Sequence, residues 1–248
     1  MSIDLPRSVV AALWLGALRR DPTLLPPALV AVQGQDEPHR TGDGQTLEEL
    51  LSRLVVEAEV VHAALPVPGA PGVPAGAAEE ALAAQEAVLV RGPGGQTTTA
   101  IPVVTEFGSA WEPGAMVTWQ VVASSAVVPM PDSLGEARRD LTEALELAID
   151  ALTQMDVAQW REEAATEIAT LASAEVPASV AQVLPPGLDV RARDLLVRAA
   201  RLQAIVALAA EDDGAAVNVW QVDQRAAAMR HVGGTARRAM VAATLSAG

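Results

Sequence analysis

The sequence predicts an α+β protein with a small antiparallel three-stranded meander packed by helices and an all-helical C-terminal half. Three segments rich in Val and Thr, residues 87–91, 97–106 and 115–124, are separated by short turns that contain Gly, as is typical of sequential antiparallel strands. Beyond these segments, apolar residues recur every three or four positions, which is the spacing of an amphipathic helix. We therefore expect an α+β region over residues 1–130. We expect a helical region over 131–248, either as a separate domain or packed as one unit with the first.

Two helices are predicted in the first 65 residues. Asp4 ahead of Pro6 has the form of a helix N-cap with proline in the first turn, and the apolar residues up to position 18 have the spacing of an amphipathic helix. A second helix is predicted over residues 46–65, because Thr46 and Glu49 have the spacing of a capping box. Its inner face is expected to consist of Leu47, Leu50, Leu51, Leu54 and Val55.

A Pro- and Gly-rich run separates these helices from the predicted sheet. Residues 66–76 cannot hold regular structure, because proline removes backbone donors and glycine adds conformational freedom. A short helix over residues 77–85 leads into the first strand. The Gly-Pro-Gly-Gly sequence that begins at Gly92 resembles a phosphate-binding loop, but it has no lysine and joins two predicted strands. We interpret it as a hairpin turn.

The helical region is predicted to contain five helices. The first covers residues 134–155 and carries a continuous apolar stripe, and the second covers 157–174. A Pro-Pro-Gly sequence at 185–187 breaks the chain. The remaining helices are expected over 190–210, 215–231 and 235–245. Gly233 and Gly234 open the last one, and Thr235 caps it.

The composition excludes several kinds of chemistry. The chain has no Cys and no Lys, so thiolate nucleophiles, iron–sulfur clusters, Cys-ligated zinc, Schiff bases and P-loop lysines are excluded, and we expect no cofactor. The net charge of −14 disfavours binding to nucleic acid or to an anionic membrane. The apolar segment at residues 8–18 is shorter than the about 20 residues that span a bilayer and lacks a signal-peptide pattern. We expect a cytoplasmic location.

Arginines concentrate near the C-terminus and form the best candidate for an anion-binding site. An arginine side chain presents a planar fork of donors that binds carboxylates and phosphates through two hydrogen bonds. The alternative is pairing with acidic residues of the same chain, since Asp194 and Arg198 already have i,i+4 spacing. The candidate residues are Arg191, Arg198, Arg201, Arg237 and Arg238.

Acidic residues of the two helices predicted over 134–155 and 157–174 form a candidate metal site. Two helices that offer carboxylates can hold Mg²⁺ for phosphate hydrolysis, as in all-α nucleotide pyrophosphatases. The acids of the first helix lie opposite its leucine stripe, which also fits a solvated face. The candidate ligands are Glu143, Glu146, Asp150, Glu163 and Glu167. A Glu-x-x-His sequence at Glu59 and His62 has no second copy, so we interpret it as an incidental surface pair.

Several short segments resemble an uncharacterised actinobacterial protein family of unknown function, mainly in the C-terminal third. The resemblance implies a bacterial source and assigns no catalytic or binding residue. The segments are Leu65-Pro66-Val67-Pro68-Gly69, Glu86-Ala87-Val88-Leu89, Leu184-Pro185-Pro186-Gly187, Arg193-Asp194-Leu195-Leu196, Glu211-Asp212-Asp213-Gly214-Ala215 and Ala236-Arg237-Arg238-Ala239.

Amphipathic helices are abundant in this sequence and recognisable catalytic motifs are scarce. We therefore favour a non-enzymatic protein-interaction or regulatory module, in which the Ala-rich helical region self-associates or docks a partner protein. Two alternatives stay open: a metal-dependent phosphohydrolase that uses the helical carboxylates, and an anion or nucleotide sensor that uses the C-terminal arginines.

Overall fold

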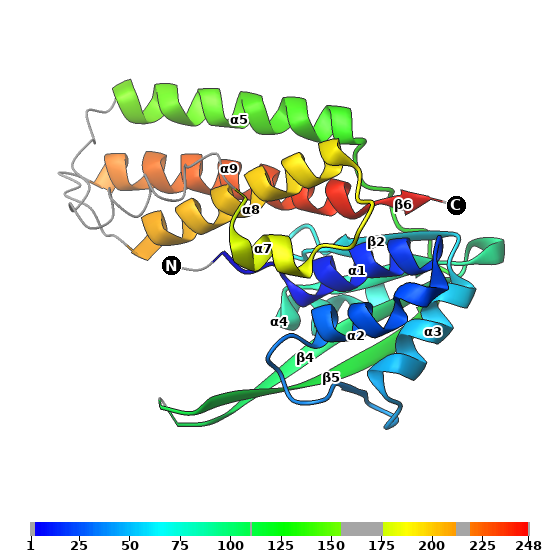
Figure 1. Ribbon diagram of the computed structural model, residues 1–248. Coiled ribbons are helices and arrows are strands. Elements are labelled where there is room, and N and C mark those ends of the chain that lie inside the picture. The colour runs from blue at the N-terminus through cyan, green and yellow to red at the C-terminus, as the bar shows by residue number, and fades with distance from the viewer. Residues whose placement is uncertain (1–2, 110, 155–175, 212–218, 248) are drawn as a thin grey trace. The chain divides into compact units, whose positions relative to one another are not determined.

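The structure is a computed structural model that describes residues 3–109, 111–154, 176–211 and 219–247, with side chains described except in 148–154, 208–211, 219–225 and 246–247 (Figure 1). The chain divides into two compact units. The helical unit comprises residues 1–4, 132–181 and 190–243. The sheet unit comprises residues 5–131, 182–189 and 244–248.

The sheet unit is built on a mixed sheet whose strand order is β1-β5-β4-β3-β2-β6. Neighbouring strands are antiparallel except for β1 and β5, which are parallel. The three predicted strands pair in the predicted order as β3-β4-β5, so the meander is present, but the sheet extends beyond it on both sides. The strands are β1 (Arg40–Thr41), β2 (Val60–Ala64), β3 (Ala87–Arg91), β4 (Thr97–Gly108), β5 (Pro113–Ser124) and β6 (Ser246–Ala247).

Strand β2 corrects the predicted helix over residues 46–65. Helix α3 (Leu47–Glu57) begins with the predicted capping box of Thr46 and Glu49, and its four leucines are buried. The helix then ends, and residues 60–64 pair with β3. The β-branched pair Val60 and Val61 is favoured in a strand, and the neighbouring strand overrides the helical spacing. Residues three apart on a strand point to opposite faces, so Glu59 and His62 do not share one helix face.

Helix α1 (Arg7–Leu18) is buried on every side rather than amphipathic. All its residues from Ser8 to Leu18 are buried, and it packs against β2, β3, α3 and α2 (Leu25–Gln33). A helix that is apolar all round belongs in the interior of a unit, which corrects the predicted amphipathic helix. Pro6 occupies the N-cap position without a side-chain cap bond, so the predicted cap at Asp4 is wrong as well.

A second small core lies where helix α4 meets the sheet. Helix α4 (Ala78–Ala84) follows a single helical turn at Ala75–Ala77 and packs on β4, which confirms the short helix predicted before the first strand. Alanine predominates in this core, so helix and sheet approach closely. The core consists of Ala64, Val73, Ala77, Ala81, Ala87, Leu89 and Ile101. The Gly-rich segment after β3 is a turn that joins β3 to β4, as predicted.

The helical unit contains α5 (Leu134–Gln154), α8 (Val190–Glu211), and most of α7 (Ala178–Val183) and of α9 (Val219–Thr244). Helix α5 begins with reciprocal hydrogen bonds between Ser133 and Glu136. It buries Ala137, Leu141 and Ala144, which confirms the apolar stripe over the part of the helix whose side chains are described. The predicted helix over 157–174 lies outside the described residues.

Helix α9 corrects the prediction of two helices separated at Gly233-Gly234. The helix continues through both glycines. The Gln203 side chain of α8 donates a hydrogen bond to the Gly233 carbonyl, and a Cβ added at Gly233 would come within 3.3 Å of Val206 Cγ1. Gly233 therefore allows close approach of the two helices rather than ending one. The C-terminal half is also not entirely helical, because residues 246–247 form β6 and pair with β2.

Within the described ranges, none of the helices combines the length and the apolar character needed to cross a membrane.

Candidate functional site

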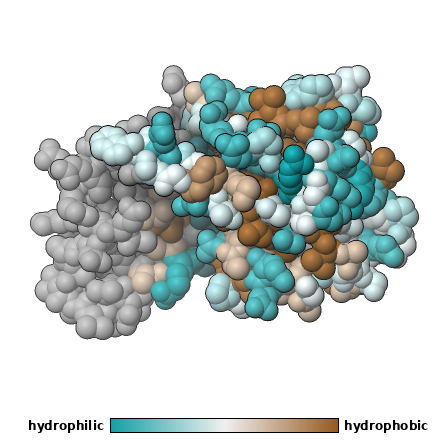
Figure 2. Space-filling view, turned by 90° about the horizontal axis from the view of Figure 1, so that it is seen from below, coloured by the Kyte–Doolittle hydropathy of each residue, from teal (hydrophilic) through white to brown (hydrophobic). Residues whose placement is uncertain are grey.

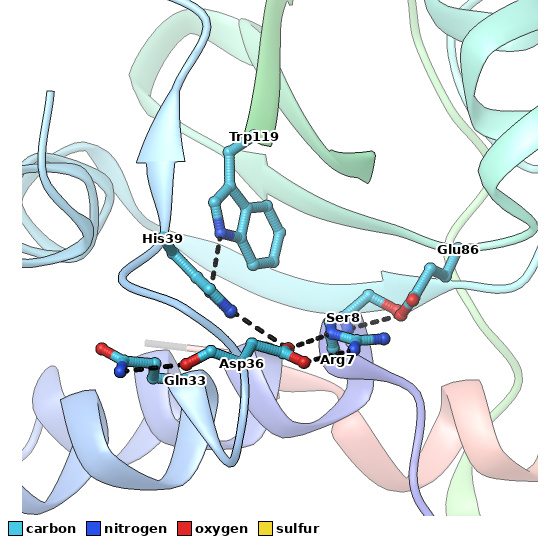
Figure 3. A network of polar contacts seen from close by, with 7 residues as sticks. All are labelled: Arg7, Ser8, Gln33, Asp36, His39, Glu86 and Trp119. Atoms are coloured by element: carbon cyan, nitrogen blue, oxygen red, sulfur yellow. Dashed lines mark hydrogen bonds and ion pairs between the residues drawn. The ribbon is translucent and has the colours of Figure 1, made fainter. Parts of the chain in front are cut away.

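A network of polar side chains lies at the start of α1 in the sheet unit (Figure 3). The Asp36 carboxylate accepts hydrogen bonds from Arg7 Nε at 2.6 Å and from Arg7 Nη2 at 2.8 Å. Asp36 Oδ2 also lies 3.2 Å from His39 Nε2. On the other side of the His39 ring, Trp119 Nε1 donates to His39 Nδ1 at 3.3 Å. The network therefore joins α1, the segment before β1, and β5.

The contacts of His39 fix its protonation state. The Trp119 indole can only donate a hydrogen bond, so His39 Nδ1 is the acceptor and carries no proton. The Nε2 proton then donates to Asp36. Burial lowers the pKa of His39 although Asp36 opposes the shift. Both ring nitrogens are occupied, so this histidine holds structure and offers no free nitrogen for proton transfer or metal binding.

Asp36 and Arg7 each stabilise the charged form of the other. Burial alone would raise the pKa of Asp36, but the hydrogen bonds from Arg7 and His39 lower it below the ordinary value. The hydrogen bond to Asp36 raises the pKa of Arg7, and the more distant carboxylates of Glu86 and Glu106 act in the same direction. Asp36 and Arg7 are therefore an ion pair at neutral pH.

Glu86 is a buried carboxylic acid placed at the first turn of α1. Its Oε2 accepts a hydrogen bond from the backbone N–H of Ser8 at 2.7 Å, so the side chain satisfies one of the free donors at the helix N-terminus. Burial raises the pKa of Glu86 in spite of the Ser8 bond and the nearby Arg7. The role of this contact is to fix α1 to the start of β3.

Sequence reasoning did not find this network. Its members come from four separate places in the chain, residues 7–8, 36–39, 86 and 119, and no sequence spacing relates these places to one another. Only the folded sheet brings Trp119 next to His39, and no pattern at the sequence level signals that contact.

The β4–β5 hairpin extends beyond the rest of the sheet as a two-stranded arm (Figure 1). Strands β4 and β5 pair along their whole length, from Thr97 with Ser124 to Gly108 with Pro113. Strand β3 pairs only with residues 97–100, and β1 only with 118–119. We call residues 103–117, apart from the undescribed residue 110, the arm. Trp119 lies at its base, so the polar network anchors it.

The arm exposes large apolar side chains. Phe107 is 51% exposed, Met116 is 46% exposed and Trp111 near the tip is 93% exposed, while Val103 and Val104 are each 37% exposed. The face of the molecule seen from below in Figure 2 shows hydrophobic side chains exposed among hydrophilic ones.

The register gives the two faces of the arm different chemistry. Residues directly opposite each other share a face, and Thr105 pairs with Met116 while Phe107 pairs with Gly114. One face therefore carries Val103, Thr105, Phe107, Gly114 and Met116 and has no charged residue. The charged residues of the arm, Glu106 and Glu112, are both acidic and lie outside this face.

The predicted anion-binding arginines lie on α8 and α9 of the helical unit. Arg191, Arg198 and Arg238 are exposed, and Arg201 and Arg237 are partly buried. The head groups of Arg237 and Arg238 flank Gly234: Arg237 Nη2 and Arg238 Nη1 would each be 3.9 Å from a Cβ on that residue. Burial and the neighbouring Arg238 lower the pKa of Arg237. The anion site stays a prediction.

The predicted metal ligands remain untested as a site. Glu143 and Glu146 are exposed on α5, the side chain of Asp150 is not described, and Glu163 and Glu167 lie outside the described residues. Across the parts of the chain that the structure describes, no three or more His, Asp or Glu side chains gather to hold a metal ion.

Two family models match this chain and together cover most of it. Residues 8–133 match the N-terminal domain of Rv1486c-like protein, and residues 135–241 match the C-terminal domain of Rv1486c-like protein. No curated protein and no solved structure matches the chain.

Proposed function

This chain belongs to the Rv1486c-like protein family, and we propose that it is a cytoplasmic, non-enzymatic protein-interaction module of an actinobacterium that binds a partner protein through the arm. The single observation that carries this proposal is the exposure of Phe107, Trp111 and Met116 on an element that projects from the sheet. Exposed apolar groups that cluster on one element favour an interaction surface over a random surface position.

The anchoring of the arm supports its use as a preformed binding element. The Trp119 side chain at the base of the arm is 1% exposed and bonded to His39, which is in turn tied to α1 through Asp36 and Arg7. A binding element that is already ordered loses less conformational entropy on association. The arm therefore presents its apolar side chains at low entropic cost.

The negative charge of the arm favours a partner that carries positive charge around its contact surface. The contact face is uncharged, and the charged residues of the arm, Glu106 and Glu112, lie outside this face and are both acidic. A partner with an apolar cleft bordered by Arg or Lys complements both features. Association with a second copy is disfavoured, because each copy carries a net charge of −14 and would bring like charges together.

The helical region is a weaker candidate for the docking surface than we expected from the sequence. In the described part of the helical unit, Leu147 and Val190 are exposed at 55% and 58% and Val176 at 37%, but they lie in three different segments. Single exposed apolar residues are normal on protein surfaces. The arm instead places several of them together.

Site-specific photo-crosslinking in the native host tests the proposal. A photoreactive amino acid at position 111 is compared with one at position 56, where Val56 is 86% exposed outside the arm. We expect position 111 to crosslink one partner protein that position 56 does not capture. The affinity of the purified partner for the full chain is then measured by calorimetry with Phe107→Ser and, as a control, Val56→Ser.

The loss of affinity expected for Phe107→Ser can be estimated from the general cost of removing an aromatic side chain that a partner buries. Truncating an aromatic anchor at the centre of an interface costs about 2 kcal/mol or more, which corresponds to a Kd roughly 30-fold weaker. Val56→Ser should leave the Kd unchanged. Equal crosslinking at positions 111 and 56, capture of only a second copy of this chain, or an unchanged Kd for Phe107→Ser would each refute the proposal.

A further inference from the structure

The C-terminal part of α9 carries positive charge that its own helix cannot neutralise. From Arg225 to the end, the chain contains four Arg and no Asp or Glu. Ion pairs within a helix need an acid three or four positions away, and neither Arg237 nor Arg238 has an acid within that distance. Ion pairing within the helix is therefore excluded for these two residues.

The two arginines fold back over the pair Gly233-Gly234. A Cβ on Gly233 would lie 3.9 Å from Arg237 Nη1, and a Cβ on Gly234 would lie 3.9 Å from both Arg237 Nη2 and Arg238 Nη1. The two guanidinium groups therefore flank the same glycine, and Arg238 Nη2 also donates to Thr235 Oγ1. Burial lowers the pKa of Arg237, and the neighbouring charge of Arg238 lowers it further. Two like charges therefore lie on either side of Gly234, one partly buried on Arg237 and one exposed on Arg238.

Gly234 is unexplained by packing alone. Glycine is one of the least favourable residues inside a helix, and Gly233 is accounted for by its contact with Val206. At Gly234, by contrast, the near neighbours are only the two arginine head groups. The absence of a side chain at this position leaves open the space between the two guanidinium groups.

We propose that Arg237 and Arg238, folded over Gly233 and Gly234 of α9, form a binding site for a doubly charged tetrahedral oxyanion such as a phosphate monoester. Two guanidinium groups offer several N–H donors to the oxygens of such an anion. The anion neutralises the repulsion between the two cations. This site lies in the helical unit and is independent of the arm.

Phosphorus-31 NMR titration of the full chain tests the site. Inorganic phosphate and methyl phosphate are titrated separately at constant ionic strength, with sodium chloride as the balancing salt. We expect saturable broadening of both signals, and preference between them tells whether a free phosphate or an esterified one fits better. Arg237→Gln and Arg238→Gln, alone and combined, are compared with Arg230→Gln, an exposed arginine on the same helix.

The single variants should weaken binding severalfold and the double variant at least tenfold, while Arg230→Gln should bind like the parent protein. Circular dichroism establishes that each variant is folded, and the two single variants keep the test decisive if the double variant is not. Phosphate binding that is absent in the parent, or that is equally weakened by Arg230→Gln, would overturn the proposal.

Discussion

Replacement of Asp36 by alanine should destabilise the sheet unit by about 2–5 kcal/mol. The change removes the acceptor for two Arg7 donors and for the His39 Nε2 proton. The His39 side chain is fully buried, so its unpaired N–H costs about 1–3 kcal/mol. The Arg7 side chain is 31% exposed, and water can partly replace the carboxylate, so we reduce the loss of that pair to about 1–2 kcal/mol.

Urea denaturation measures the free energy of unfolding, and amide hydrogen exchange locates the change. We expect faster exchange in α1 and β5, the elements that the network joins. Asp43→Ala is the control, because Asp43 is exposed and bonds only to the nearby Thr41 among the described side chains. An Asp36→Ala variant that is as stable as the control, or that loses protection only outside α1 and β5, would show that the network does not hold these elements together.

Three further predictions concern pH and the arm. Burial lowers the folded-state pKa of His39. The contribution of neutral His39 to the free energy of unfolding is therefore complete above the unfolded-state pKa of about 6.5, and it declines as the pH falls toward the folded-state pKa. An NMR titration that shows a pKa of His39 above the ordinary value would contradict this. Burial raises the folded-state pKa of Glu86, so its stabilisation is complete below the unfolded-state value and is lost as the pH rises through the folded-state value. Urea denaturation should therefore show Glu86→Gln gaining on the parent protein as the pH rises, and a constant difference would refute the assignment. Gly108 has φ +91°, and a Cβ there would collide with the Glu112 carbonyl oxygen, so Gly108→Ala should cost about 1–3 kcal/mol and raise hydrogen exchange in the arm. The matched control is Gly135→Ala, at an exposed position of α5, which should stabilise by about 0.5–1 kcal/mol.

The sequence correctly predicted those features of the fold that depend on residues close together in the chain. The capping box at Thr46 and Glu49 correctly predicted the start of α3. The Gly-rich segment after β3 was correctly predicted to be a turn between two strands and not a phosphate-binding loop. The apolar stripe of α5 also identified its buried side. These features depend on residues that lie close together in the sequence.

Contacts between distant residues decided the elements that the sequence did not predict. Residues 60–64 pair with β3, and this pairing ends the predicted helix early. Gly233 packs against Val206 of another helix, so it continues a helix where local propensity predicted a break. The segment at 246–247 joins the sheet through β2, which no local pattern indicates.

The candidate sites depended even more on distant contacts. The Arg237–Arg238 pair was visible as a charge pattern, but its position over Gly234 was not. The polar network and the exposed face of the arm follow from strand register, which the sequence alone did not fix.

The interleaving of the two units in the chain links their folding. Ala63 N–H donates to Thr244 Oγ1, and β6 pairs with β2, so the sheet gains these bonds only when residues 244–247 return from beyond the intervening helices. An unfolded insertion between the joined segments makes that closure entropically unfavourable, whereas a folded one shortens the effective loop. During synthesis from the N-terminus, the first 131 residues can form only a sheet that lacks β6. Folding of the residues between the two segments then helps to bring β6 back to β2, because it shortens the effective loop that joins them.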